Sequence, residues 1–275
     1  MWGRGHEDRP PTSPQESPSE APDREPEIVL TGGNMNAVTR RGDAVHRTAG
    51  PWTPTIHRLL DHLADAGIDC LPRPLGLDEQ GREMLTYLPG IVPTYPLPSW
   101  VWTDRVLAET GALLARIHQA STTFDRADAI WQLPLHEPGE VICLNDMAPY
   151  NMVFDDDHQL SGLIDLDTAS PGPRSWDLAY LAYRIVPLSA AEDTGIGPIT
   201  AEERRRRLEL LASAYAAAGD QIRIETTDIL RTAVARLDEL AEFTADRAAA
   251  GAVHVASHVE IYRRDAEWIT RDLLP

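Results

Sequence analysis

The sequence has only two cysteines and no long apolar segment. Cys70 and Cys143 lie far apart in apolar surroundings, which excludes a disulfide framework and a closely spaced zinc site. No run of about eighteen apolar residues occurs, and the N-terminus lacks the charged stub and apolar stretch of a secretion signal. We therefore expect neither a membrane span nor secretion, and we predict a cytoplasmic protein.

Basic residues are scarce relative to acidic ones. The chain has 43 acidic and 25 basic residues, which gives a formal net charge of −18. Nucleic acids and anionic membranes bind clusters of basic side chains, because these displace counterions. The charge balance therefore argues against nucleic-acid and membrane partners and favours cationic or metal-bound ones.

The first 90 residues divide into a polar tail and a β-rich segment. Residues 1–26 are rich in proline, serine and acidic residues, and we predict a disordered tail. Residues 27–90 contain the short β-like runs EIVL, NAVTRRG, DAVHRT and REMLTYL, separated by glycine-bearing turns. An apolar stripe at helical spacing in PTIHRLLDHLADAG predicts one helix between the third and fourth runs. This segment is expected to form a small antiparallel sheet with one helix.

The remaining residues, 91–275, are mainly helical in pattern. Helical periodicity covers residues 106–121, 201–218, 226–249 and roughly 252–272, although the β-branched residues of the last segment suit a strand equally well. Two strand-like stretches interrupt this pattern, EVICL with MVF, and LSGLIDL. The chain is therefore predicted to be an α+β protein with a β-rich lobe over 27–90 and a larger α-rich lobe over 91–275.

Polar side chains adjoin the apolar runs of VICLNDMAPYNMVFDDDHQLSGLIDLD, residues 141–167. Asp146 and Asn151 lie on the segment that joins two strand-like runs, with Pro149 between them, and Asp165 ends the next apolar run. Carboxylate and carboxamide oxygens suit Mg²⁺, which often takes its remaining ligands from substrate phosphates. Alternatively, each is an ordinary turn residue, since Asp and Asn favour turns. All three in this order favour a magnesium and nucleotide site.

Three motifs together resemble a known family. NDMAPYN (145–151), LIDLD (163–167) and SWDLAYLAYR (175–184) follow a small β lobe and a proline-rich connector. This order is similar to that of the aminoglycoside phosphotransferase family, which has the protein-kinase-like bilobal fold. The resemblance covers about residues 28–270. It implies a small-molecule kinase that uses Mg²⁺ and ATP or GTP.

The resemblance assigns roles to individual residues. Asp146 matches the carboxylate that orients and deprotonates the acceptor hydroxyl, and Asn151 and Asp165 match the magnesium ligands that bridge the nucleotide phosphates. Asp177 matches a buried aspartate that fixes the backbone of the catalytic loop. Strand alternation would put Asp167 on the same side as Asp165, where it either supports the metal ligands or caps a turn.

The β-rich segment carries the expected nucleotide contacts. Gly32 and Gly33 lie where the family has a turn over the nucleotide, and glycine lets the backbone approach phosphate. Arg47 falls where the family has a basic residue that touches the α- and β-phosphates, although a solvated arginine is the alternative. Tyr87 and Leu88 fall in the hinge that holds the base through backbone groups.

The chain departs from the family pattern at two places. The helix that should carry an acidic partner for Arg47 has only His57 and Arg58 as polar residues around Ile56 to Leu60. Leu144 stands where the family has a histidine that supports the metal-binding turn. Both departures argue against catalysis. The three candidate site residues Asp146, Asn151 and Asp165 are nevertheless all present.

Two functional hypotheses follow. The first is a kinase that transfers the γ-phosphoryl group of ATP or GTP to a hydroxyl of an unidentified small molecule. The second is a non-catalytic nucleotide-binding or toxin-sequestering module, because GPWTPTIHRLLDHL weakly resembles trifolitoxin-immunity proteins of the same family. Retention of Asp146, Asn151 and Asp165 favours the enzyme, since a binding module has no chemical need for the base.

Overall fold

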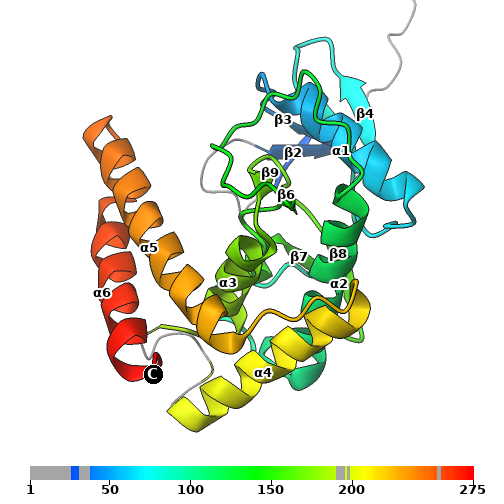
Figure 1. Ribbon diagram of the computed structural model, residues 1–275. Helices are drawn as coiled ribbons and strands as arrows, with labels where there is room; N and C mark the ends of the chain where they lie inside the picture. Colours follow the sequence, from blue (N-terminus) through cyan, green and yellow to red (C-terminus); the bar gives the residue numbers. More distant parts are fainter. Residues whose placement is uncertain (1–25, 31–37, 190–195, 197–198, 253–254) are drawn as a thin grey trace, which may run out of the picture.

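The protein has a sheet region and a helical region that lie side by side (Figure 1). The computed structural model describes residues 26–30, 38–189, 196, 199–252 and 255–275. An antiparallel sheet with one helix forms the first region, and the helices α2 to α6 dominate the second. The predicted α+β bilobal fold is confirmed. The predicted tail, residues 1–26, lies outside the described part except for Pro26, and the lobe boundary at residue 90 stays a prediction.

Five strands make the main sheet, in the order β1-β2-β3-β5-β4, and every neighbouring pair is antiparallel. Their bounds are β1 Ile28–Leu30, β2 Val38–Arg41, β3 Ala44–Arg47, β4 Pro74–Leu77 and β5 Glu83–Thr86. The strand β4 is not among the predicted ones, because its proline and glycine disfavour a strand. It lies at the edge of the sheet, where a proline without an amide hydrogen is tolerated.

Helix α1, Thr53–Asp65, covers the sheet with its apolar face. Ile56, Leu59, Leu60 and Leu63 are all at most 1% exposed, and they join the main hydrophobic core. This spacing is the stripe that the sequence predicts, and burial of each such side chain contributes roughly 1.5–3 kcal/mol.

Two short antiparallel pairs stand between the sheet and the helices. Strand β6 (Val141–Cys143) pairs with β9 (Ser170–Gly172), and β7 (Met152–Phe154) pairs with β8 (Leu160–Leu163). The ends of β6, β7 and β8 carry the predicted site residues. These pairs therefore form the platform on which the site is built.

The connector between the two regions is held against β7. Ile91 and Phe154 exchange two backbone hydrogen bonds, of 2.7 and 2.9 Å. Gly90 has a φ of 147°, and a Cβ at this position would lie 2.5 Å from the carbonyl oxygen of Phe154. Only glycine fits here, because both the backbone conformation and the close approach exclude a side chain.

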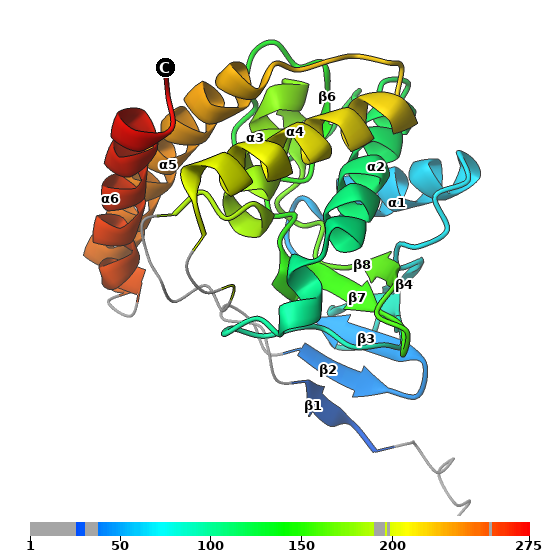
Figure 2. The same ribbon diagram turned by 90° about the horizontal axis from the view of Figure 1, so that it is seen from below.

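Five helices complete the second region, and Figure 2 shows α3 between the β strands and the outer helices. Their bounds are α2 Asp104–Ser121, α3 Arg174–Ile185, α4 Ala201–Ala218, α5 Thr226–Ala249 and α6 Ala256–Asp272. Helix α4 packs on α2, α5 packs on α3, and α6 packs on α5. For residues 252–272 the sequence suits a strand and a helix equally well. The structure has a helix there, α6. Among the described helices, none is both long and apolar enough to cross a membrane.

Candidate active site

The guanidinium of Arg47 binds three carboxylates. Strand register places Arg47 opposite Glu83 on β5, and Nε donates to Glu83 Oε2 at 2.5 Å. One terminal nitrogen donates to Asp165 Oδ1 at 3.0 Å, and the other donates to Asp167. The side chain of Glu83 is fully buried, and that of Arg47 is 10% exposed. Arg47 therefore ties the main sheet to the segment that follows β8.

The acidic partner of Arg47 comes from a strand and not from helix α1. The sequence shows no acid on the helix around Ile56 to Leu60, and the structure explains how the cation is nevertheless paired. His57 of α1 makes a hydrogen bond of 2.9 Å from Nε2 to Glu83 Oε1, so the helix contributes an imidazole to a carboxylate that β5 supplies. Helix α1 thus supplies no acidic partner to Arg47, as the sequence indicates, but strand β5 supplies one. The signal was Glu83 itself, a charge inside the strand-like run REMLTYL.

We expect Glu83→Gln to lower the free energy of unfolding by roughly 1.5–3 kcal/mol, the range for a hydrogen bond to a charged group. Glutamine keeps the shape but removes the charge that faces Arg47 in a buried place. Denaturant unfolding measures the effect. The exposed Glu267→Gln on α6 is the matched control, and a loss no larger than that of the control would contradict a buried ion pair.

Asp165 and Asp167 lie in an irregular segment. Strand β8 ends at Leu163, so strand alternation is not what aligns the two carboxylates, but both bond the guanidinium of Arg47 and therefore lie on the same side, as expected. Asp165 has a φ of 63°, a left-handed conformation that Asp adopts more readily than most residues. Its side chain is 53% exposed, whereas that of Asp167 is 13% exposed. Burial raises the pKa of Asp167 to about 6, and the charge of Arg47 opposes this.

Asp146 lies three residues after β6, and two tyrosines hold its carboxylate. The hydroxyls of Tyr150 and Tyr180 donate to Oδ1, at 2.6 and 2.9 Å. Burial raises the pKa of both tyrosines above the ordinary value, so both hydroxyls stay protonated and donate. Burial also raises the pKa of Asp146, and the two hydrogen bonds oppose this rise. The carboxylate is thus fixed in one orientation within a largely dry environment.

Asn151 connects the segment of Asp146 to that of Asp165. It ends a 3-10 turn, Pro149–Asn151, and its Nδ2 donates to the backbone oxygen of Asp146 at 2.9 Å and to Oδ2 at 3.1 Å. Its own backbone oxygen accepts from the amide of Ile164 at 2.9 Å, directly before Asp165. The structure therefore brings Asp146, Asn151 and Asp165 together. The amide oxygen of Asn151 keeps its lone pairs, since only the nitrogen is used.

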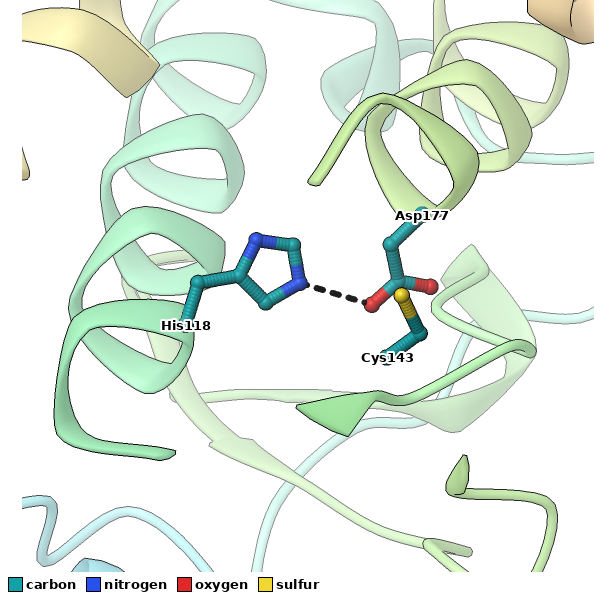
Figure 3. Close-up of side chains that lie close together, drawn as sticks. All are labelled: His118, Cys143 and Asp177. Carbon is teal, nitrogen blue, oxygen red and sulfur yellow. Dashed lines mark hydrogen bonds and ion pairs between the residues drawn. The ribbon is translucent and has the colours of Figure 1, made fainter. Parts of the chain in front are cut away.

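Asp177 of α3 holds the backbone before Asp146. Its Oδ2 accepts from the amide of Leu144 at 2.7 Å, and its Oδ1 accepts from the amide of Asn145 at 2.9 Å. Figure 3 shows His118 of α2 beside it, with 3.0 Å between His118 Nε2 and Asp177 Oδ2. The side chain of Leu144 is 3% exposed and belongs to the main core. A leucine here packs, so the task of supporting this turn falls to Asp177 and His118.

The same cluster includes Cys143, whose sulfur lies near both His118 and Asp177 (Figure 3). All three side chains are at most 1% exposed. Each already has a protein partner: the thiol donates to the Pro173 carbonyl at 3.3 Å, and His118 Nδ1 bonds the Tyr215 hydroxyl at 2.7 Å. Burial raises the pKa of the Cys143 thiol, which keeps it neutral and a poor metal ligand. The cluster supports the site and is not a metal centre.

Asn145 and Arg236 are site residues that the sequence did not reveal. Asn145 has a φ of 65°, and its side chain donates to the Thr168 carbonyl at 2.8 Å and the Ser170 hydroxyl at 2.9 Å. Arg236 of α5 donates to the backbone oxygen of Asn145 at 2.5 Å. Together they fix the turn that presents Asp146. No short sequence motif joins Arg236 to this turn, 91 residues earlier in the chain.

The remaining predicted nucleotide contacts are placed only in part. Gly32 and Gly33 lie outside the described residues. Tyr87 follows β5; its amide donates to the Asp43 carbonyl at 2.8 Å, and Arg40 stacks on its ring at 3.7 Å. Leu88 packs over Gly162 of β8, where a Cβ would lie 2.9 Å from the leucine side chain. Roles in nucleotide binding for these four residues stay predictions.

Comparison with known proteins matches part of the chain to a family model. The model of the phosphotransferase enzyme family, APH, matches residues 124–211. The trifolitoxin immunity protein of Rhizobium leguminosarum bv. trifolii is 34% identical over 199 residues, which are 69% of this chain and 74% of that protein.

Solved structures share the fold at low sequence identity. A choline/ethanolamine kinase family protein from Mesorhizobium loti superposes with a TM-score of 0.62 at 15% identity, over 90% of this chain and 88% of that one. The GDP and kanamycin complex of APH(2")-IIia superposes with a TM-score of 0.56 at 13% identity, over 89% and 94% of the two chains.

These similarities agree with the arrangement of the site. The chain therefore belongs to the aminoglycoside phosphotransferase family, has its protein-kinase-like fold, and is related to the trifolitoxin immunity protein.

Proposed function

We propose that the protein is a magnesium-dependent kinase that transfers the γ-phosphoryl group of ATP or GTP to a hydroxyl of a small molecule. The family and its kinase relatives support a small-molecule phosphotransferase. The observation that carries the proposal is the meeting of Asp146, Asn151 and Asp165 at the ends of three strands, with Arg47 reaching Asp165 from the main sheet. We propose that it acts in the cytoplasm.

Asp146 is the proposed base. Its Oδ1 accepts from two tyrosine hydroxyls, while Oδ2 has only the Asn151 amide as a donor among the described residues. Oδ2 therefore keeps a lone pair for the proton of an acceptor hydroxyl. Because the carboxylate is oriented before the acceptor arrives, little reorganisation is needed during the reaction.

The oxygen donors of Asn151 and Asp165 fit Mg²⁺. One is a carboxamide oxygen and the other is a carboxylate whose side chain is half exposed, both hard ligands of the kind that Mg²⁺ prefers. When bound, the ion would neutralise charge on the transferring phosphates. Asp167, on the other terminal nitrogen of Arg47, would help to fix the segment that carries Asp165.

Arg47 is the proposed contact to the nucleotide phosphates. The chain contains no lysine, so an arginine here follows the composition of the whole protein and is not a local loss. A guanidinium can bind two oxygens at once, and its planar shape accounts for the simultaneous bonds to Glu83, Asp165 and Asp167. Solved relatives that contain GDP support GTP as one of the two possible donors.

The pH dependence of turnover should reflect Asp146. Burial raises the pKa of this carboxyl above its ordinary value of 3.8, and only the deprotonated form can accept a proton. Turnover should therefore fall as the pH drops through this raised pKa, at a higher pH than an exposed aspartate would give. A pH profile of the turnover number measures this. A flat profile down to pH 4 would contradict the role of Asp146 as base.

A screen for nucleotide consumption tests the proposed function. Purified protein with Mg²⁺ and ATP or GTP is incubated with hydroxyl-bearing metabolites and aminoglycosides, and Asp146→Asn serves as the blank. We expect at least one acceptor to raise nucleotide consumption in the parent but not in the blank. Equal consumption by both proteins across the panel would contradict the kinase.

An immunity-type binding module is the second candidate. It is favoured by the 34% identity to the trifolitoxin immunity protein and by Leu144 in place of the family's histidine. Such a module needs no base. Nucleotide binding without turnover, together with binding of a toxin peptide that Asp146→Asn leaves unchanged, would support it over the kinase.

A further inference from the structure

Arg184, near the end of α3, is surrounded by tyrosines. Its guanidinium lies over three rings, with 5.1 Å to the centroid of Tyr95, 5.2 Å to Tyr150 and 5.7 Å to Tyr183. Its Nε is buried and has no hydrogen-bond partner within the described chain. No carboxylate of the described residues forms an ion pair with it. We call these four side chains the tyrosine cage.

This environment is unusual for a chain with 43 acidic residues. The buried arginines near the site have strong acceptors: Arg47 binds three carboxylates, and Arg236 binds the backbone oxygen of Asn145. A partly buried guanidinium without an ion pair is costly, because Asp146 acts on it only at longer range, and cation–π contacts recover only part of that cost. A ligand that carries a negative charge would supply the rest.

The tyrosine cage adjoins the proposed base. The hydroxyl of Tyr150 donates to Asp146 Oδ1 at 2.6 Å, while its ring lies beside Arg184. The charge of Arg184 also lowers the pKa of Asp146, although burial outweighs this effect. Helix α3 holds Asp177 behind the Asp146 turn and presents Arg184 seven residues later, so one rigid element positions both. A molecule whose hydroxyl meets Asp146 therefore lies close to Arg184.

We propose that the tyrosine cage binds a carboxylate of the acceptor, so that the substrate is a hydroxy acid rather than an amine-bearing sugar or choline. The rings lie around the guanidinium, and Tyr95 also interacts with it through its hydroxyl. The terminal N–H groups of a guanidinium match the two oxygens of a carboxylate. An ammonium group in the same place would meet a like charge. Phosphorylation of the bound hydroxy acid rests on the proposed function. Binding of its carboxylate to the tyrosine cage does not, because it requires no nucleotide.

Four probes test the cage on the full chain by calorimetry, without nucleotide. D-glycerate and glycerol differ in a single carboxylate, and choline and kanamycin supply cationic alcohols. We expect the wild type to bind glycerate more tightly than the other three. Arg184→Gln should weaken glycerate binding at least about tenfold, Arg184→Lys should weaken it less, and the exposed Arg231→Gln on α5 should leave it unchanged.

Several results would overturn the proposal: equal glycerate binding by the wild type and Arg184→Gln, no glycerate binding by the wild type, or tighter binding of choline or kanamycin. If Arg184→Gln does not fold, the test is whether the wild type and Arg184→Lys bind glycerate more tightly than the other three probes. Titration of the same preparations with Mg²⁺ and nucleotide separates the two proposals. Glycerate binding without nucleotide binding would contradict the kinase alone, and nucleotide binding with a preference for choline would contradict the cage alone.

Discussion

Replacing Asp146 with asparagine is expected to lower turnover roughly 10²–10⁴-fold, the usual contribution of a general base, and to leave nucleotide binding nearly intact. Asparagine keeps the size of the side chain and can still accept from Tyr150 and Tyr180 through its oxygen. It cannot take the proton of the acceptor hydroxyl. Steady-state kinetics with an acceptor found by the nucleotide-consumption screen measures the change.

The control for this variant is Asp156→Asn, an exposed aspartate in the turn between β7 and β8. It should leave both turnover and nucleotide affinity unchanged. A reduction in turnover of less than about tenfold for Asp146→Asn would mean that this carboxylate does not act as the base. A loss of nucleotide affinity as large as the loss of turnover would mean that it serves binding instead.

Replacing Asp177 with alanine is expected to lower the free energy of unfolding by about 3–5 kcal/mol, because each buried donor left without its acceptor costs about 1–3 kcal/mol. Its carboxylate is 0% exposed and accepts from the amides of Leu144 and Asn145 and from His118. Without it, two buried amides and an imidazole lose their acceptor. Denaturant unfolding measures the loss, which is a large part of the 5–15 kcal/mol of a typical domain.

The exposed Asp238→Ala on α5 is the control for Asp177→Ala. The loss of unfolding free energy for Asp177→Asn should lie between those for Asp238→Ala and Asp177→Ala. Its amide oxygen can still accept a hydrogen bond, but its NH₂ group cannot. If Asp177→Ala destabilised the fold by less than about 1 kcal/mol, the carboxylate would not be what holds the Asp146 turn in place.

The helices were the most predictable part of the structure. Helical periodicity predicted residues 201–218 and 226–249, and α4 and α5 have these bounds. Long amphipathic helices show a repeated 3.6-residue spacing, so the pattern is sampled many times. Strand β4 spans only Pro74–Leu77 and depends on pairing with β5 for its conformation. Pairing between segments leaves little local trace in the sequence.

The residues around the site show the same difference between local and distant information. Asp146, Asn151 and Asp165 are predicted from short motifs, and the structure brings them together. The partnership of Arg47 and Glu83 depends on the register of β3 and β5, which the sequence does not specify locally. Arg184 ends the motif SWDLAYLAYR, but nothing in the motif marks it as important. Its environment depends on the tyrosines around it and on the absence of a paired carboxylate among the described residues.

Titration with ATP or GTP in the presence of Mg²⁺ or EDTA tests most directly whether Asn151 and Asp165 form a magnesium and nucleotide site. We expect the wild type to bind nucleotide at least about tenfold more tightly with Mg²⁺, a difference of about 1.4 kcal/mol. Asp165→Asn should lose most of this difference, because it removes the negative charge that holds the ion. Equal affinity in Mg²⁺ and EDTA, for the wild type and for Asp165→Asn alike, would contradict a magnesium-dependent kinase at this site.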